Sequence, residues 1–323
     1  PERYLSSYRA LEELAAGARG DEDEILAVKI GEMTARMWTL RQMSLAVADG
    51  VALGTNPVVE AAIVKDLGAT LEQDMPMLAQ IYANEPPGDR STSAAVTDYL
   101  FAARRHAGNP ARDHRAGNGA KMNEQMTMIV DSLDRLLTDL AAMAPEAPEQ
   151  WQMVEEMGVC DLLLDEEQGG MGAGWAEAEP ALRLLGARAI GLPIGETMIA
   201  RRLLSQAALP VPQGPVALAT VRHPEIAPER MIAVGAWLRT AQIGGALAAA
   251  LDLTIDYAKV RSQFGRELRK FQAIQQQIAL LAEEVAATAS ASASAAAALD
   301  RGPGDFAIAC AKLRANQAAG AGA

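Results

Sequence analysis

Long stretches in which apolar side chains recur about every 3.6 residues constrain this chain more than any other feature of its sequence. Such stretches cover residues 24–48, 122–143, 229–260 and 271–299. Each is long enough for an α-helix with one apolar face, whereas strands are usually about 5–6 residues long. Only residues 216–221 form the short apolar run that favours a strand. The sequence therefore predicts a mainly α fold built from helical bundles.

Composition agrees with helices and excludes some classes of partner. Half of the 323 residues are hydrophobic but only 4% are aromatic, so alanine, leucine and methionine supply the apolar surface, and these residues favour helices. A length of this size predicts about two domains. The formal net charge of −12 argues against binding to nucleic acid or to an anionic membrane. No stretch has the length and apolarity of a membrane helix or the pattern of a signal peptide, so we expect no membrane partner and a cytoplasmic location.

The cysteines and histidines do not predict a metal site. Cys160 and Cys310 lie in no CxxC pattern, and the three histidines have no HExxH-like spacing. We expect two buried free thiols, because unpaired cysteine is among the residues most often buried.

The chain is divided by a basic stretch rich in glycine and asparagine, RRHAGNPARDHRAGNGAK, at residues 104–121. Directly after it, Met122 begins MNEQMTMIVDSLDRLL, which has the pattern of a natural protein N-terminus followed by an amphipathic helix. We therefore predict a helical domain at 1–110, a junction at 111–121, a second helical domain at 122–209, a short remnant of a β domain at 210–228, and an incomplete C-terminal helical domain at 229–323.

Two motifs carry more information than periodicity. The first, GVCDLLLDEEQGGMG at 158–172, places three glycines where the backbone must reverse tightly, and a structural turn is its simplest meaning. The second is YAKVRSQFGRELRKFQAIQ at 257–275, in which several uncommon residues keep fixed offsets. Both resemble acyl-CoA dehydrogenases: the first their N-terminal helical domain, and the second the Y-A-x-x-R-x-Q-F-G and F-Q-x-I-Q segments of their C-terminal domain.

The resemblance implies a FAD site. In the family, the residues matching Arg261, Gln263 and Phe264 contact the diphosphate and adenosine part of FAD, and those matching Phe271 and Gln272 lie close by. The residue types suit this role, because a guanidinium makes forked bonds to a diphosphate and phenylalanine covers a flat ring. A simpler alternative is that Arg261 only offsets the negative end of a helix.

Residues 29–80, including VVEAAIVKDLGATLEQDM, resemble the C-terminal domain of the two-subunit, heteromeric branch of the same family. This implies that segments of two subunits are joined in one chain. The central β-barrel of the family is largely missing, since only 210–228 could belong to it. The loop that carries the catalytic glutamate in most members is also absent, and Gly235 occupies the alternative position. Catalytic residues are therefore unassigned, and Glu166, Glu229 and Asp256 are interpreted as ordinary solvated acids.

The function implied is that of a FAD-dependent acyl-CoA dehydrogenase, an oxidoreductase that introduces an α,β double bond into an acyl-CoA thioester, with electron-transfer flavoprotein as acceptor. Relatives of this branch take bulky substrates, including steroid side chains. The alternative is a non-catalytic helical assembly subunit of such a complex, and an unrelated helical adaptor is a third reading. The Ala-rich segment 286–298 predicts close helix packing within a bundle, and we also expect a homo- or hetero-oligomer formed through the C-terminal helices.

Overall fold

The structure, a computed structural model, describes residues 11–12, 14–15, 24–82, 124–143 and 147–321. The chain divides into two compact units, Pro1–Gly119 and Ala120–Ala323, which are described separately. The predicted mainly α fold is confirmed. The division falls inside the predicted junction, while the five-part domain assignment remains a prediction. No helix in the described ranges is both long and apolar enough to cross a membrane.

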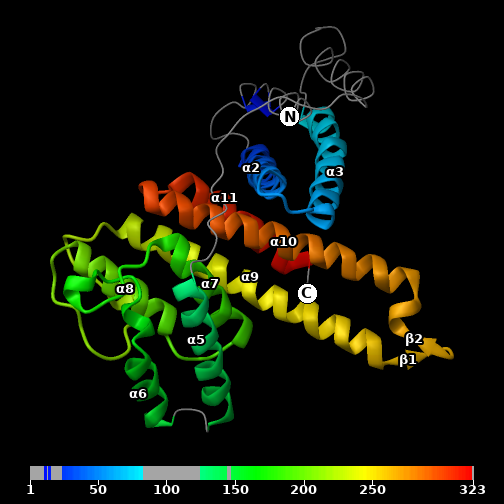
Figure 1. Cartoon of the computed structure of the whole chain (residues 1–323). Coiled ribbons are helices and arrows are strands. Elements are labelled where there is room, and N and C mark those ends of the chain that lie inside the picture. Colours follow the sequence, from blue (N-terminus) through cyan, green and yellow to red (C-terminus); the bar gives the residue numbers. More distant parts are fainter. Residues whose placement is uncertain (1–10, 13, 16–23, 83–123, 144–146, 322–323) are drawn as a thin grey trace. The chain divides into compact units, whose positions relative to one another are not determined.

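The first unit contains a helical hairpin formed by α2 (Glu24–Ala52) and α3 (Val58–Tyr82) (Figure 1). The chain turns between them at Gly54, whose φ of 80° lies in the left-handed region that suits glycine. Pro57 stands just before α3 and its carbonyl accepts from Ala61 N, a position near the start of a helix that suits proline.

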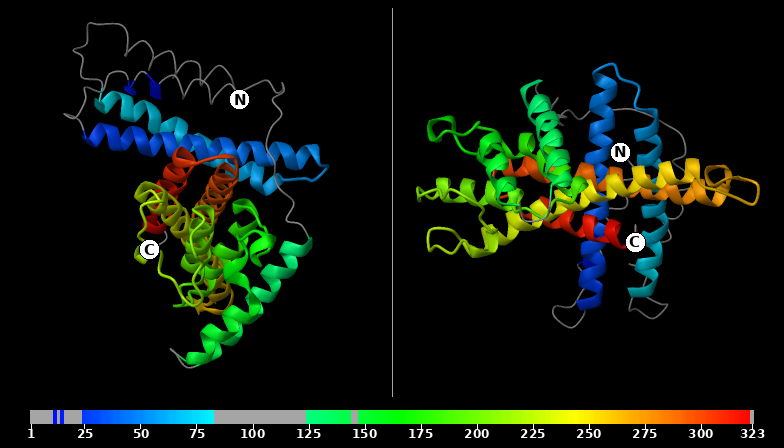
Figure 2. Two further views of the ribbon diagram at one scale, coloured as in Figure 1. Left: turned by 90° about the vertical axis from the view of Figure 1, so that its left-hand side faces the viewer. Right: turned by 90° about the horizontal axis from the view of Figure 1, so that it is seen from below.

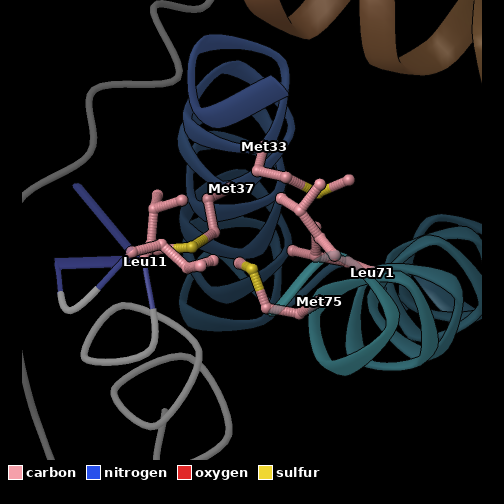
Figure 3. Packing of buried hydrophobic residues seen from close by; sticks show 7 residues of the cluster. Leu11, Met33, Met37, Leu71 and Met75 are labelled. Atoms are coloured by element: carbon pink, nitrogen blue, oxygen red, sulfur yellow. The ribbon is translucent and has the colours of Figure 1, made fainter. Parts of the chain in front are cut away.

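Sulfur-containing and leucine side chains fill the space between α2 and α3 (Figure 3). Met75 is fully buried at the centre of this cluster. Beside it, Arg36 Nη1 of α2 donates to Asp74 Oδ2 of α3 at 2.7 Å, which fixes the register of the hairpin. The buried members of the cluster are Leu11, Leu14, Met33, Met37, Leu71, Met75 and Leu78.

The second unit is a bundle of seven α-helices in its described residues, with four 3₁₀ turns and one small β-hairpin. The α-helices are α5 (Glu124–Ala142), α6 (Pro148–Met157), α7 (Trp175–Arg188), α8 (Ile194–Gln206), α9 (Pro228–Val260), α10 (Gln272–Arg301) and α11 (Asp305–Ala321). The 3₁₀ turns are η2 (Val159–Asp161), η3 (Glu166–Gln168), η4 (Leu218–Thr220) and η5 (Leu268–Lys270). The strands are β1 (Ser262–Gln263) and β2 (Arg266–Glu267).

Small residues let α7, α9 and α10 approach one another closely. A Cβ atom added at Gly245 of α9 would lie 1.8 Å from the carbonyl oxygen of Arg183, and one at Gly186 of α7 would lie 2.0 Å from that of Gln242. The Ala-rich face of α10 packs within the same bundle, which confirms close packing. Its buried residues are Ala287, Thr288, Ala291, Ser292, Ala295, Ala296 and Leu299. This face is occupied inside the chain, so it is not available for oligomerisation, which remains a prediction.

Two contacts between distant segments join α10 to the rest of the bundle. Asp300, near the end of α10, accepts hydrogen bonds from the first two residues of α7, Trp175 N at 2.7 Å and Ala176 N at 3.0 Å. The ring of Trp175 meets that of Trp237 edge to face at 5.5 Å, and Trp237 Nε1 donates to Ser292 O at 3.2 Å. The start of α7 is therefore completed by residues of α9 and α10.

The glycine motif at 158–172 is a structural turn, as its simplest reading predicts. Gly169 and Gly172 have φ of 83° and 66°. A Cβ atom at Gly170 would lie 2.2 Å from the carbonyl oxygen of Leu164, so only glycine fits there.

The strand predicted at 216–221 is wrong, because this segment contains the 3₁₀ turn η4 instead. Its backbone polar groups bond to side chains of α8: Val216 N donates to Thr197 Oγ1 at 2.9 Å, and Leu218 N donates to Glu196 Oε2 at 3.0 Å. These bonds replace the ladder that a strand would need.

Arg201 of α8 is fully buried and joins three segments. It forms ion pairs with Glu155 at 2.6 Å and with Asp161 at 2.8 Å, and it also contacts Gly214 O. Burial pushes the pKa of Glu155 up, but the hydrogen bond and charge of Arg201 outweigh it, so this pKa lies below its usual value. The network fixes α6, η2 and α8 to one another.

Both cysteines are free and buried, as predicted. Burial raises the pKa of Cys160 to about 12 and that of Cys310 to about 11, so both remain thiols at neutral pH. In the part of the chain that the structure describes, no group of His, Cys, Asp and Glu is arranged to hold a metal ion.

Candidate functional site

The predicted cofactor residues lie at the tip of an arm formed by the ends of α9 and α10 (Figures 1 and 2). Helix α9 ends at Val260, and Arg261 follows it in extended conformation, with φ −78° and ψ 126°. Arg261 N donates to Tyr257 O at 2.9 Å, which closes the last turn. Its exposed side chain therefore lies at the negative end of the α9 dipole. This position suits the simpler role, in which Arg261 only offsets that negative charge.

Beyond Arg261 the chain forms a hairpin that sequence analysis did not predict. Ser262 pairs with Glu267 and Gln263 with Arg266 in antiparallel register. The two residues between the strands, Phe264 and Gly265, have φ of 51° and 76°, and two consecutive positive φ values are typical of a type I′ turn. Phenylalanine is unusual in such a position, because its Cβ is crowded there. The turn holds the Phe264 ring 92% exposed at the tip.

An arginine lies between this turn and the start of α10. The Cζ atom of Arg266 lies 4.0 Å from the ring centroid of Phe271, within the range of a cation–π interaction. The rings of Phe264 and Phe271 meet edge to face at 6.4 Å. Arg266 was not among the predicted cofactor residues. Its contact with Phe271, five residues later, depends on β2 and the 3₁₀ turn η5, which sequence analysis did not predict.

Five cations occur within residues 259–270, and three of them have carboxylate partners. Glu267 pairs with both Arg269 and Lys270, whose hydrogen bonds hold the pKa of its carboxyl below the usual value. Lys259 Nζ pairs with Asp256 Oδ1 at 2.9 Å. Arg261 and Arg266 have no carboxylate partner among the described residues. The tip therefore carries two uncompensated guanidinium groups on a chain whose formal net charge is −12.

The five predicted residues lie within one sequence segment, 261–272, and the structure brings two of them, Phe264 and Phe271, into ring contact. Arg261, Gln263, Phe264 and Gln272 are exposed, and Phe271 is half-buried. The arrangement can bind an anion through guanidinium groups and cover a flat ring through Phe264. It does not enclose a ligand, because four of the five side chains face solvent.

A shallow groove of about 290 Å³ runs between α9 and α10 behind the hairpin. Its wall is almost wholly apolar, and Lys259, Arg269 and Gln275 supply the polar groups. The apolar residues that line it are Ile255, Ala258, Ile278, Ala279 and Ala282.

Gly235 lies on α9 beside η4. It occupies the position at which some members of the resembled family carry an alternative catalytic base. A Cβ atom there would lie 3.3 Å from Leu218 Cδ2, so a longer side chain would meet this apolar residue of η4. Glu166, Glu229 and Asp256 are all exposed, as predicted for solvated acids. The described residues thus give no reason to assign a catalytic base.

Comparison with known proteins gives a family match in the C-terminal third of the chain. Residues 226–323 match the family described as acyl-CoA dehydrogenase, C-terminal domain. A segment of 75 residues, 23% of the chain, is 40% identical to a 3-sulfinopropanoyl-CoA desulfinase of Paraburkholderia xenovorans (strain LB400). The matched segment spans 19% of the length of that relative.

Proposed function

We propose that the chain, whose residues 226–323 match the acyl-CoA dehydrogenase C-terminal domain, forms the helical part of a FAD-dependent acyl-CoA dehydrogenase. The reaction would introduce a double bond between the α and β carbon atoms of an acyl-CoA thioester. Bound FAD would supply the hydride acceptor for this chemistry. The observation that carries the proposal is the pair of uncompensated guanidinium groups, Arg261 and Arg266, beside the exposed ring of Phe264.

The residues of the arm fit the diphosphate and adenosine end of FAD. Arg261 has free donors for a diphosphate, and Arg266 lies within the same hairpin with its position fixed over Phe271. The Phe264 ring offers an apolar face, and the exposed amides of Gln263 and Gln272 offer directional hydrogen bonds. No described part of the second unit encloses a flavin ring around these residues. In this proposal the arm holds one end of the cofactor, and other protein segments complete the pocket.

The comparisons support an acyl-CoA substrate better than they support a particular reaction. The matched family is named for acyl-CoA, and the desulfinase is named for a CoA thioester. Since that relative is named for cleavage at sulfur, family membership does not define which bond is broken. Dehydrogenation, electron-transfer flavoprotein as acceptor, and a homo- or hetero-oligomer are therefore parts of our proposal. So is the origin of residues 1–110 and 122–323 from two subunits.

The test is the FAD affinity of an Arg261→Ala variant of the full chain, measured by flavin fluorescence. Loss of a charge-assisted bond, worth about 1.5–3 kcal/mol, should weaken FAD binding roughly tenfold or more. Arg222→Ala is the matched control, because Arg222 is also exposed and its loss changes net charge equally. Equal affinities in the two variants would contradict a diphosphate contact at Arg261.

A second candidate is a non-catalytic assembly subunit, favoured by the exposure of the arm and by the presence of glycine, which has no carboxyl group, at position 235. Such a subunit would keep the bundle and bind no flavin. Visible flavin absorbance of the purified full chain, alone and after mixing with FAD, separates the two functions. Absence of flavin in both samples would favour the assembly subunit.

A further inference from the structure

A carboxyl group is buried inside the second unit, between α7 and α10. Glu179 of α7 is only 3% exposed. It lies on the same face of α7 as the buried residues Trp175, Ala178 and Leu182. A glutamate at such a position is rare unless it is paired, because an isolated charge in an apolar interior is strongly unfavourable.

The polar partners of Glu179 are incomplete. Its Oε2 atom lies 3.8 Å from Arg183 Nε, a long distance for an ion pair, and the Arg183 side chain is 39% exposed. Its Oε1 atom has no hydrogen-bond partner among the described residues. Ser292 of α10 lies close enough to influence the carboxyl, although no bond of standard geometry joins the two. The hydroxyl of Thr288, one turn away on α10, also has no partner in the described part of the chain.

Other charged groups around this site are engaged elsewhere. On α10, Asp300 accepts from the first two backbone N–H groups of α7, and Glu284 pairs with Arg314 of α11. On α5, Asp134 pairs with Arg188.

Helix α9 presents no titratable group to this site among its buried residues. It contributes the buried Trp237 and, beside Arg183 and Thr288, Gly244. Arg183 is thus the charge that acts on the carboxyl, and it is partly solvated.

We propose that Glu179 is a proton-sensitive joint between α7 and α10, protonated while the two helices are packed together, and that its ionisation weakens their contact. A neutral carboxyl leaves no charge in this apolar interior, whereas a carboxylate here would be opposed only by Arg183, which lies 3.8 Å away and is partly solvated. Burial also raises the pKa of Glu179, although Arg183 and Ser292 oppose the shift. The joint lies where the helices before residue 226 meet the matched family domain, so proton binding would couple these two parts.

The sign of the pH dependence follows from the raised pKa. The stabilisation that the protonated group provides is complete below the pKa of an unfolded glutamate and is lost as pH rises through the folded pKa. Packing of α7 on α10 should therefore take up a proton from solvent and weaken toward alkaline pH.

The test compares the full chain with its Glu179→Gln variant, which mimics the protonated form. A Trp38→Phe background leaves tryptophan emission only from the second unit, so that urea unfolding of this unit can be followed. Between about pH 5 and about pH 8, the unfolding equilibrium constant of the wild type should rise relative to that of Glu179→Gln by at least about tenfold. Glu167→Gln, at an exposed position of η3, is the control and should follow the wild type. Equal pH dependence in wild type and Glu179→Gln would overturn the proposal.

A second measurement needs no variant. Infrared spectroscopy of the wild type with isotope-labelled glutamate should show a protonated carboxyl band at neutral pH that disappears on unfolding in urea. A folded chain without this band would also overturn the proposal, even if Glu179→Gln failed to fold.

Discussion

Helices α9 and α10 are each buried along one half and exposed along the other, and the two halves differ in the size of their side chains. Where they pack against α7 and α11, they carry many small residues, such as Gly245 and Ala291, beside a few large buried ones such as Trp237. In the arm they carry large apolar residues that face solvent, such as Leu253, Tyr257 and Val260. Within these helices, small side chains are therefore typical of the close crossings, whereas several large apolar side chains in the arm are exposed, against the usual expectation for apolar residues.

The difference indicates that one half of each helix stabilises the bundle and the other half presents side chains to solvent. The small residues bring helix backbones close enough that one added methyl group would meet a carbonyl oxygen. The arm contributes little to this packing and presents cations and aromatic rings at its tip. We therefore expect substitutions in the buried half to change stability, and substitutions in the arm to change binding with little effect on stability.

The largest expected effect is in the buried half. Gly245→Ala should destabilise the second unit by about 3 kcal/mol, because its new Cβ atom forces α7 and α9 apart. Urea unfolding of the full chain, followed by tryptophan fluorescence, measures this change. Gly191→Ala is the control, since a Cβ atom at Gly191 meets nothing within 4 Å. Similar losses in both variants would show that the close crossing is not what makes position 245 sensitive.

The next effect concerns the buried ion network. Arg201→Met should destabilise the second unit by about 2 kcal/mol at neutral pH, because Glu155 and Asp161 lose their partner while remaining partly solvated. The lowered pKa of Glu155 gives stability that is present above the pKa of an unfolded glutamate and is lost as pH falls through the folded value. The difference between wild type and variant should therefore shrink in acid, as urea titrations at several pH values would reveal. A difference that stays constant down to acid pH would contradict a role for the ion pairs.

The smallest effect on stability is expected at the tip of the arm. Phe264→Asn should change stability by less than about 1 kcal/mol, because asparagine tolerates positive φ and the lost ring is exposed. FAD affinity, measured by flavin fluorescence, should fall as the apolar cover is lost. A large loss of stability with unchanged FAD affinity would remove the distinction between the arm and the buried half.

Periodicity predicted the long helices well. The predicted spans 24–48, 229–260 and 271–299 correspond to helices at Glu24–Ala52, Pro228–Val260 and Gln272–Arg301. Their positions follow from local spacing, which a single sequence contains. Which side of each helix is buried does not follow from this spacing. The segment around Ala291 has small residues on every side, so no apolar face indicates which side meets α7 and α9.

Two features, one in the candidate site and one in the bundle, could not have been predicted, for physical reasons. The hairpin at 262–267 has two residues in each strand and a Phe-Gly turn, whereas Asn-Gly is the usual signal for a type I′ turn. The burial of Glu179 depends on α10, more than 100 residues later in the chain, and a charged residue on a helix is ordinarily exposed. Both depend on contacts or strain that local sequence does not encode.

The hydrogen bonds from the first turn of α7 to Asp300 also affect the order in which the protein can fold during synthesis. They join residues 125 and 124 positions apart in the chain. While a ribosome is still translating the intervening residues, Trp175 N and Ala176 N must be satisfied by water, because Asp300 has not yet been made. At about 5–20 residues per second, this interval lasts on the order of ten seconds. The start of α7 therefore reaches its final form only after α10 has emerged, and nascent chains truncated before residue 300 should leave this helix end open to hydrogen exchange.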